Sequence, residues 1–117
     1  MTKLAAGAIG VSSEEVLVAS TGVIGQLLPM ELLKAGMGRI VLTRDGSHKL
    51  AKAMMTTDTV PKEAAIKVND GEFTIGGVAK GSGMLHPDLA TLLCFLTTDA
   101  NVERDFLKFA LRKAADV

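Results

Sequence analysis

The sequence has few aromatic residues and no net charge. Phe, Trp and Tyr make up 3% of its 117 residues, Trp and Tyr are absent, and 13 basic residues balance 13 acidic ones. Nucleic-acid-binding proteins usually carry a basic stripe and stacking aromatic side chains, so we expect no nucleic-acid partner. Hydrophobic residues account for 48% of the chain, and we therefore expect a core built from aliphatic side chains.

Cysteine and long apolar runs are also scarce. Cys94 is the single cysteine, which excludes an internal disulfide and suits a reducing compartment. The longest apolar runs are too short to span a membrane, and Met1–Leu4 lacks the apolar stretch of a signal peptide. We therefore expect a cytoplasmic protein with no membrane partner. No metal or other cofactor is implied.

Apolar periodicity predicts alternating helices and strands in one domain of the α/β class. We expect helices at residues 3–9, 30–35, 49–55 and 102–115, and strands at residues 15–19, 64–68, 72–75 and 91–97. Residues 40–43 are ambiguous and could form a further strand. Asn69-Asp70-Gly71 between two apolar runs is typical of a hairpin. These elements favour an α+β layered arrangement, with a mixed sheet, a hairpin and flanking helices.

Two single residues carry local expectations. Ser47 is a plausible N-cap for the helix that follows it, because its hydroxyl can accept a hydrogen bond from a free backbone N–H. Cys94 lies within an apolar run and is expected to face the core or a neighbouring strand. A buried lone thiol of this kind is usually inert.

The densest functional pattern runs through residues 79–100. It contains Lys80-Gly81-Ser82-Gly83-Met84, then the Ala90–Thr91 bond, then an apolar run that ends in Thr97-Thr98-Asp99-Ala100. This stretch closely resembles the processing site of the ornithine acetyltransferase (glutamate N-acetyltransferase) family, the bifunctional arginine biosynthesis proteins. The resemblance implies self-cleavage between Ala90 and Thr91, and a fold like that of ornithine acetyltransferases and DmpA-like proteins.

Two further segments extend the resemblance along the chain. Val18–Gly25 looks like the family's oxyanion-hole loop, which assigns Thr21 and Gly22 to that role. Met55–Thr59 with Pro61-Lys62 looks like the family's substrate-binding threonine motif, although Thr56 and the adjacent Thr57 are not separable by sequence. The resemblance assigns substrate binding to Thr56, Lys80 and Thr91.

The chemistry of a threonine nucleophile explains why such a site would need these residue types. A threonine hydroxyl is a poor nucleophile until a base takes its proton. If the chain breaks before Thr91, the free α-amino group of Thr91 becomes that base, because such a group titrates near pH ~8. The small Ala90 leaves room for attack by the hydroxyl, and glycines permit close backbone approach.

The resemblance also implies substrates and assembly. An acetyl group would pass from N-acetylornithine to Thr91 and then to glutamate, in arginine biosynthesis. Family members are longer at both ends, so residues 1–117 are expected to be a truncated central segment. It would span the end of the family's α chain (1–90) and the start of its β chain (91–117). We expect a homo-oligomer, or an α/β hetero-oligomer after cleavage.

Two alternatives remain open from the sequence. One is a related threonine-nucleophile amidohydrolase or aminopeptidase that shares the fold. The other is a catalytically inactive, oligomerising fragment of the acetyltransferase. Taken alone, a threonine in an apolar run is usually an ordinary strand residue, and a lone lysine such as Lys80 is usually a solvated surface charge.

Overall fold

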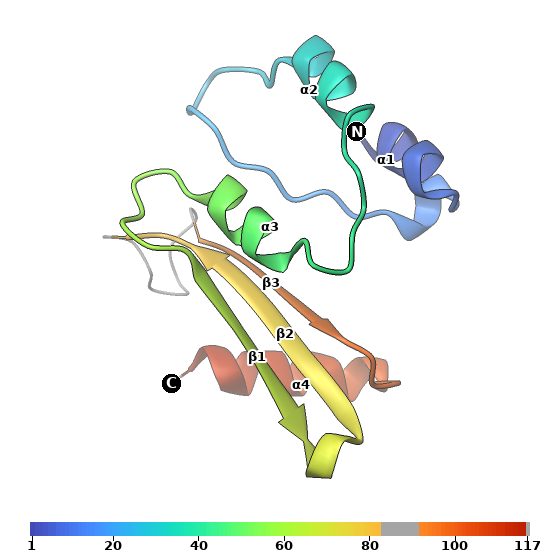
Figure 1. Ribbon diagram of the computed structural model, residues 1–117, viewed down its shortest axis with the longest axis vertical. Helices are drawn as coiled ribbons and strands as arrows, with labels where there is room; N and C mark the ends of the chain where they lie inside the picture. Colours follow the sequence, from blue (N-terminus) through green and yellow to red (C-terminus); the bar gives the residue numbers. More distant parts are fainter. Residues whose placement is uncertain (83–91, 117) are drawn as a thin grey trace. The chain divides into compact units, whose positions relative to one another are not determined.

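The computed structural model describes residues 1–82 and 92–116 (Figure 1). Contacts divide the chain into two compact units, Met1–Thr43 and Arg44–Val117. The first unit contains helices α1 and α2. The second contains helices α3 and α4 and a sheet of three strands.

In the first unit, helix α1 spans Thr2–Ile9 and ends at Gly10, as the sequence predicts. Gly10 adopts the left-handed conformation with φ 77°, which glycine tolerates at a helix end. Its backbone N–H donates to the Ala6 carbonyl at 2.8 Å. Ala6 is buried, and α1 contacts both the short 3₁₀ helix η1 and helix α2.

The strand predicted at residues 15–19 does not form. Instead, Ser13–Glu15 make the 3₁₀ helix η1, which begins with a capping box. The Ser12 hydroxyl accepts from the Glu14 N–H at 3.3 Å, and the Glu15 carboxylate accepts from the Ser12 N–H at 2.9 Å. The apolar residues after η1 find no partner strand in the first unit, so local capping decides the structure.

Helix α2 spans Met30–Met37 and follows Pro29, in agreement with the predicted helix. Residues 40–43 are not a strand. Helix α3 in the second unit spans Ser47–Met54, and its N-cap is Gly46 rather than Ser47. The prediction for Ser47 is wrong by one residue, because the Gly46 carbonyl already accepts from the Leu50 N–H at 2.9 Å.

The sheet is antiparallel with strand order β1-β2-β3. Its strands span Lys62–Val68, Phe73–Lys80 and Leu93–Thr98. The predicted hairpin joins β1 to β2 through the 3₁₀ helix η2, Asn69–Gly71, whose residues all have positive φ. Together with the flanking helices, this sheet confirms the predicted α/β class, although the described strands pair antiparallel rather than in the predicted mixed sheet.

Strand β2 is the central strand, and helix α3 packs on β1 and β2 (Figure 1). Ala51 on α3 is 0% exposed and Val78 on β2 is 9% exposed. Strand β2 continues five residues past the predicted strand end at Ile75 and includes Gly76 and Gly77. Pairing with a strand on each side holds these two glycines in extended backbone.

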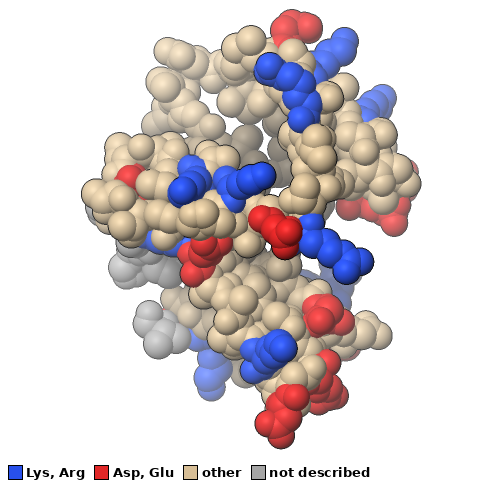
Figure 2. Space-filling view, viewed as in Figure 1, with Lys and Arg blue, Asp and Glu red and all other residues tan. Residues whose placement is uncertain are grey.

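Helix α4 spans Arg104–Ala115, close to the predicted helix, and its residues are exposed or half-buried. Cys94 on β3 is also exposed, so the expectation that it faces a core is wrong. Within the described residues, no helix combines the length and apolarity that crossing a bilayer requires. On the face shown in Figure 2, acidic and basic side chains are interspersed among uncharged ones.

Candidate active site

Asp58 connects several segments of the second unit through hydrogen bonds. Its side chain is 0% exposed and accepts three hydrogen bonds. Oδ1 accepts from the Lys62 Nζ at 2.8 Å and from the Gly81 N–H at 2.6 Å. Oδ2 accepts from the Thr56 N–H at 3.0 Å. One carboxylate thus joins the loop after α3, the start of β1 and the residue that follows β2.

The local sequence explains how this carboxylate comes to lie there. Helix α3 ends at Met54, and aspartate readily bonds the backbone of a neighbouring residue in a turn, as Asp58 does with Thr56. Pro61 then lies just before β1, where the missing N–H of proline is tolerated. Lys62, the first residue of β1, is four residues beyond Asp58 and reaches back to it.

The same contacts set the charge of Asp58. The hydrogen bond from Lys62, followed by those from the Thr56 and Gly81 N–H groups, holds the pKa of the Asp58 carboxyl well below its usual range. Burial opposes this lowering of the pKa but is weaker than the first three contributions. Asp58 is therefore ionised at neutral pH and paired with a lysine.

Lys80 lies at the end of β2, opposite Leu93 on β3. It is 8% exposed, so it is not the solvated surface charge that an isolated lysine usually is. Gly81 follows with φ 139°, a backbone conformation that residues with a side chain rarely adopt. The bond from Gly81 to Asp58 brings the end of β2 next to the loop that carries Thr56.

A second contact joins the same two segments. The hydroxyl groups of Thr57 and Ser82 lie 3.0 Å apart and share a hydrogen bond. Thr56 and Thr57 both have exposed side chains, so both hydroxyls lie at the surface of this cluster. The structure therefore places the predicted threonine motif beside the predicted Lys80-Gly81-Ser82 segment. We refer to Thr56, Thr57, Asp58, Lys62 and Lys80–Ser82 as the Asp58 cluster.

The other predicted site residues lie elsewhere in the chain. Thr21 and Gly22 are exposed in the loop between η1 and α2 of the first unit. A Cβ on Gly22 would meet the Leu28 Cδ2 atom at 3.5 Å, an ordinary contact distance. Ala90 and Thr91 lie outside the described residues, and β3 begins two residues after Thr91.

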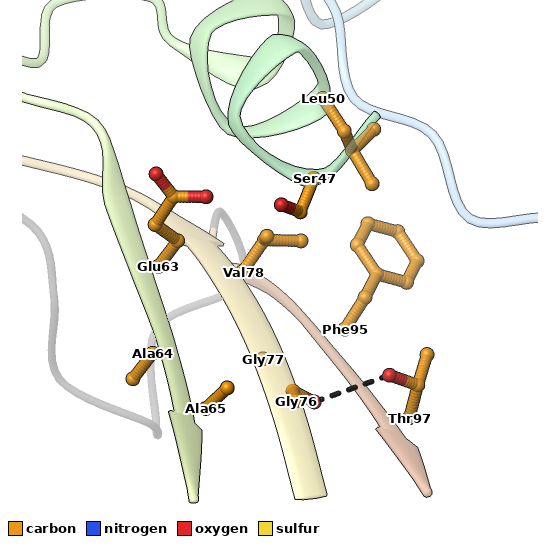
Figure 3. Close-up of a pocket in the computed structure, with 10 residues that line it drawn as sticks. All are labelled: Ser47, Leu50, Glu63, Ala64, Ala65, Gly76, Gly77, Val78, Phe95 and Thr97. Atoms are coloured by element: carbon orange, nitrogen blue, oxygen red, sulfur yellow. Dashed lines mark hydrogen bonds between the residues drawn. The ribbon is translucent and has the colours of Figure 1, made fainter. Parts of the chain in front are cut away.

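A hollow of about 370 Å³ opens between α3 and the sheet (Figure 3). Gly76 forms part of its lining, and the Thr97 hydroxyl donates to the Gly76 carbonyl at 3.4 Å. Beside it, His48 Nδ1 and the Glu63 carboxylate form a hydrogen bond that ties α3 to β1. Among the described residues, no three His, Cys, Asp or Glu side chains gather as metal ligands.

Sequence reasoning missed the residues that hold the cluster together. It assigned no role to Asp58, Lys62 or Ser82, although each lies inside a quoted motif. The available signal was the aspartate in Thr56-Thr57-Asp58-Thr59, because a short carboxylate in a turn usually binds backbone N–H groups. Its distant partner, Gly81, is 23 residues away and gives no local signal.

The described residues thus define a mixed α/β protein with a carboxylate-centred polar cluster at the start of a glycine-bearing segment. Comparison with known proteins identifies its family. The sequence model of the ArgJ family matches residues 1–117, and the chain belongs to that family.

Individual relatives agree with this assignment. The chain is 50% identical over 119 residues to the "Arginine biosynthesis bifunctional protein ArgJ" of Dehalococcoides mccartyi, and 49% identical over 118 residues to that of Oceanobacillus iheyensis. These matches cover 100% and 99% of this chain but 29% of each relative, so the chain spans less than a third of their length.

A solved structure supports the fold. The crystal structure of the arginine biosynthesis bifunctional protein argJ from Bacillus halodurans matches with a TM-score of 0.63 at 41% sequence identity. The match covers 76% of this chain and 49% of that one.

Proposed function

We propose that this chain carries the central part of a self-processing acetyltransferase of arginine biosynthesis. The acetyl group would pass from N-acetylornithine to Thr91 and then to glutamate. The main support is the family match over the whole chain, combined with the Asp58 cluster, which joins the threonine motif to Lys80 and Gly81. The relatives are named as bifunctional arginine biosynthesis proteins.

Processing would begin with attack by the Thr91 hydroxyl on the carbonyl carbon of Ala90. The peptide C–N bond breaks, an ester to Thr91 forms, and the Thr91 nitrogen becomes an amine. Water then hydrolyses the ester and leaves a carboxylate on Ala90 and a free hydroxyl on Thr91. The new amine is the base that a threonine nucleophile requires.

Acyl transfer would use the same hydroxyl in two steps. The Thr91 oxygen attacks the acetyl carbonyl of N-acetylornithine, and the released ornithine amine takes the proton. The glutamate amine then attacks the acetyl ester and regenerates Thr91. Each step passes through an oxyanion, for which Thr21 and the Gly22 N–H are the proposed donors; loss of one such donor typically costs ~100- to 1000-fold in rate.

Lys80 and Thr56 are the proposed substrate contacts. Lys80 offers a point positive charge to a carboxylate or a polarised carbonyl, and the residue is largely buried at the end of β2. The Thr56 hydroxyl would add a hydrogen bond. Lys80 pairs with Leu93, which is two residues after Thr91, so the chain links the proposed nucleophile directly to this end of the sheet.

The length of the solved relative is compatible with a chain break. Its match with this chain takes up 49% of the solved chain, whereas the longer match with the Dehalococcoides relative takes up 29% of that protein. The solved chain is therefore much shorter than the curated relatives. A polypeptide that ends at the bond equivalent to Ala90–Thr91 would have this property.

We propose that the processed pieces remain together as an oligomer in the cytoplasm.

The intact mass of the purified protein tests the proposal. We expect two fragments that separate between Ala90 and Thr91. Thr91→Ser keeps a hydroxyl, so this variant tests whether serine can replace threonine in the cleavage. Thr91→Ala removes the hydroxyl altogether and must abolish the break. Incubation with N-acetylornithine should add one acetyl group to the fragment that begins with Thr91.

Three results would contradict this function. The first is an unbroken parent protein, and the second is a break that persists in Thr91→Ala. The third is an acetyl group attached at a residue other than Thr91. Hydrolysis of peptide amides without acetyl transfer to glutamate would favour a related amidohydrolase instead.

A further inference from the structure

Asp58 connects segments that are distant in sequence but belong to one proposed site. Its partners Thr56 and Lys62 are two and four residues away, whereas Gly81 is 23 residues away. Gly81 follows Lys80 directly and begins the stretch of chain that leads to the proposed nucleophile. The bond between Asp58 and Gly81, together with the Thr57–Ser82 contact, therefore fixes the start of that stretch against the α3–β1 loop.

We propose that Asp58 is a positioning residue for self-processing, which holds the Gly81 backbone at the start of the segment that leads to the Ala90–Thr91 bond. This inference rests on the proposed function and adds a residue to it. Asp58 does not touch the reacting atoms. It acts through Gly81, and Lys62 assists by holding the same carboxylate oxygen.

The donor set requires a carboxylate. Two donors approach Oδ1 and a third approaches Oδ2, and every one of them is an N–H group. An ionised carboxylate only accepts hydrogen bonds, so it satisfies all three donors at once. Asparagine offers one acceptor oxygen and an NH₂ group, so at least one backbone N–H would face another donor. Asp58→Asn therefore removes a specific contact while hardly changing side-chain volume.

Lys62 provides a second, independent variant. Its ammonium group reaches the Asp58 carboxylate from the start of β1. Lys62→Met removes the charge but keeps a side chain of similar length, and leaves the buried carboxylate with two backbone donors. Lys62→Arg restores a cationic donor. If Lys62 acts through Asp58, the arginine variant should recover most of what the methionine variant loses.

A purely structural role predicts a different outcome. In that case the variants would lower the folded fraction, and the folded molecules would still break at the parental rate. Cleavage is a first-order reaction of each folded chain, so its rate constant can be measured apart from the folded fraction. The temperature of the assay is therefore set well below the melting temperature of every variant, as determined by circular dichroism.

The experiment follows the first-order rate of cleavage by intact mass in newly synthesised chain, made by pulsed cell-free translation so that it starts unbroken. We expect Asp58→Asn to slow cleavage at least ~10-fold, which corresponds to 1.36 kcal/mol of barrier. Lys62→Met should slow it by a smaller factor, and Lys62→Arg should return close to the parental rate. Asp105→Asn is the matched control, because Asp105 is an exposed carboxylate on α4 that pairs only with Lys108 in the described residues.

The outcomes separate this inference from the proposed function. Parental cleavage rates in folded Asp58→Asn would overturn the positioning role and leave the function intact. Equal slowing in Asp105→Asn would also overturn it, because the effect would not be specific to Asp58. A parent protein that never breaks at Ala90 would remove the proposed function and this inference with it.

Discussion

The Asp58 side chain carries a negative charge that solvent does not reach. Its pKa is lowered first by the bond from Lys62 and then by the Thr56 and Gly81 N–H groups. Folding therefore favours the ionised form, and protonation must oppose folding. An unfolded aspartate takes up its proton near pH ~3.9, so the stabilisation is complete above that pH and is lost as the pH falls toward the lower folded pKa.

This linkage predicts how one variant depends on pH. Asp58→Asn should be clearly less stable than the parent at pH 7, because the parent gains from an ionised Asp58 there. The difference in melting temperature should narrow as the pH is lowered below about 4, where protonation of Asp58 opposes folding of the parent and has no counterpart in the variant. Asp105→Asn serves as the control and should show little difference at any pH, since exposed ion pairs contribute little. A gap that stays constant down to pH 2 would contradict the assignment.

At the scale of elements, the local sequence predicts where helix ends and hairpin turns lie, whereas pairing between distant segments decides how far a strand extends. The left-handed Gly10 and the Asn69-Asp70-Gly71 hairpin follow from backbone preferences of a few neighbouring residues, so the sequence predicts both. The extension of β2 through Gly76 and Gly77 depends on β1 and β3. Glycine has a low strand propensity, which is why the sequence predicts the end of β2 too early.

The same distinction applies to the candidate site. The threonine motif and Lys80 could be found because the family resemblance marks them. Asp58 could not be ranked above its neighbours, since its importance depends on a bond to Gly81, 23 residues further along the chain. The strand prediction for residues 15–19 was wrong because an apolar run forms a strand only where a partner strand is available to pair with it.

Helix α4 offers a prediction about one element. The Glu103 carboxylate is its N-cap and accepts from the Asp105 and Phe106 N–H groups at 2.9 and 2.8 Å. These bonds, in that order, lower the pKa of Glu103. Glu103→Ala should fray the first turn of α4, whereas Glu103→Ser should retain a cap. Backbone chemical shifts of residues 104–107 report this directly.

The fraying of α4 should also depend on pH. Because folding lowers the pKa of Glu103, the cap is complete above the usual glutamate range and is lost as the pH falls through the lowered value. In the parent, the first turn of α4 should therefore lose helical shifts in acid before its last turn does. Glu103→Ala should show the frayed shifts at every pH. Identical shifts in parent and alanine variant at pH 7 would exclude the cap.

The molecule as a whole exposes much apolar surface. Among the described residues, the buried hydrophobic side chains are Ala6, Ala51 and Val78, while Ile66 and Leu96 on the sheet are more than half exposed. Ile66, Cys94 and Leu96 alternate with the residues that face α3, so they lie on the opposite face of the sheet. Apolar faces of this kind usually meet another surface.

Cys94 allows the solvent accessibility of that face to be measured, because it is the one thiol in the chain. In dilute solution we expect a thiol reagent to label Cys94 within a few-fold of the rate in the unfolded chain, since an exposed thiol offers no steric barrier. If copies of the chain associate through this face, labelling should slow as protein concentration rises, and Ile66→Lys should restore the fast rate by placing a charge there. Thr57→Ser, outside the face, is the control. Slow labelling that is independent of concentration and unchanged by Ile66→Lys would show that another part of the same molecule covers the face.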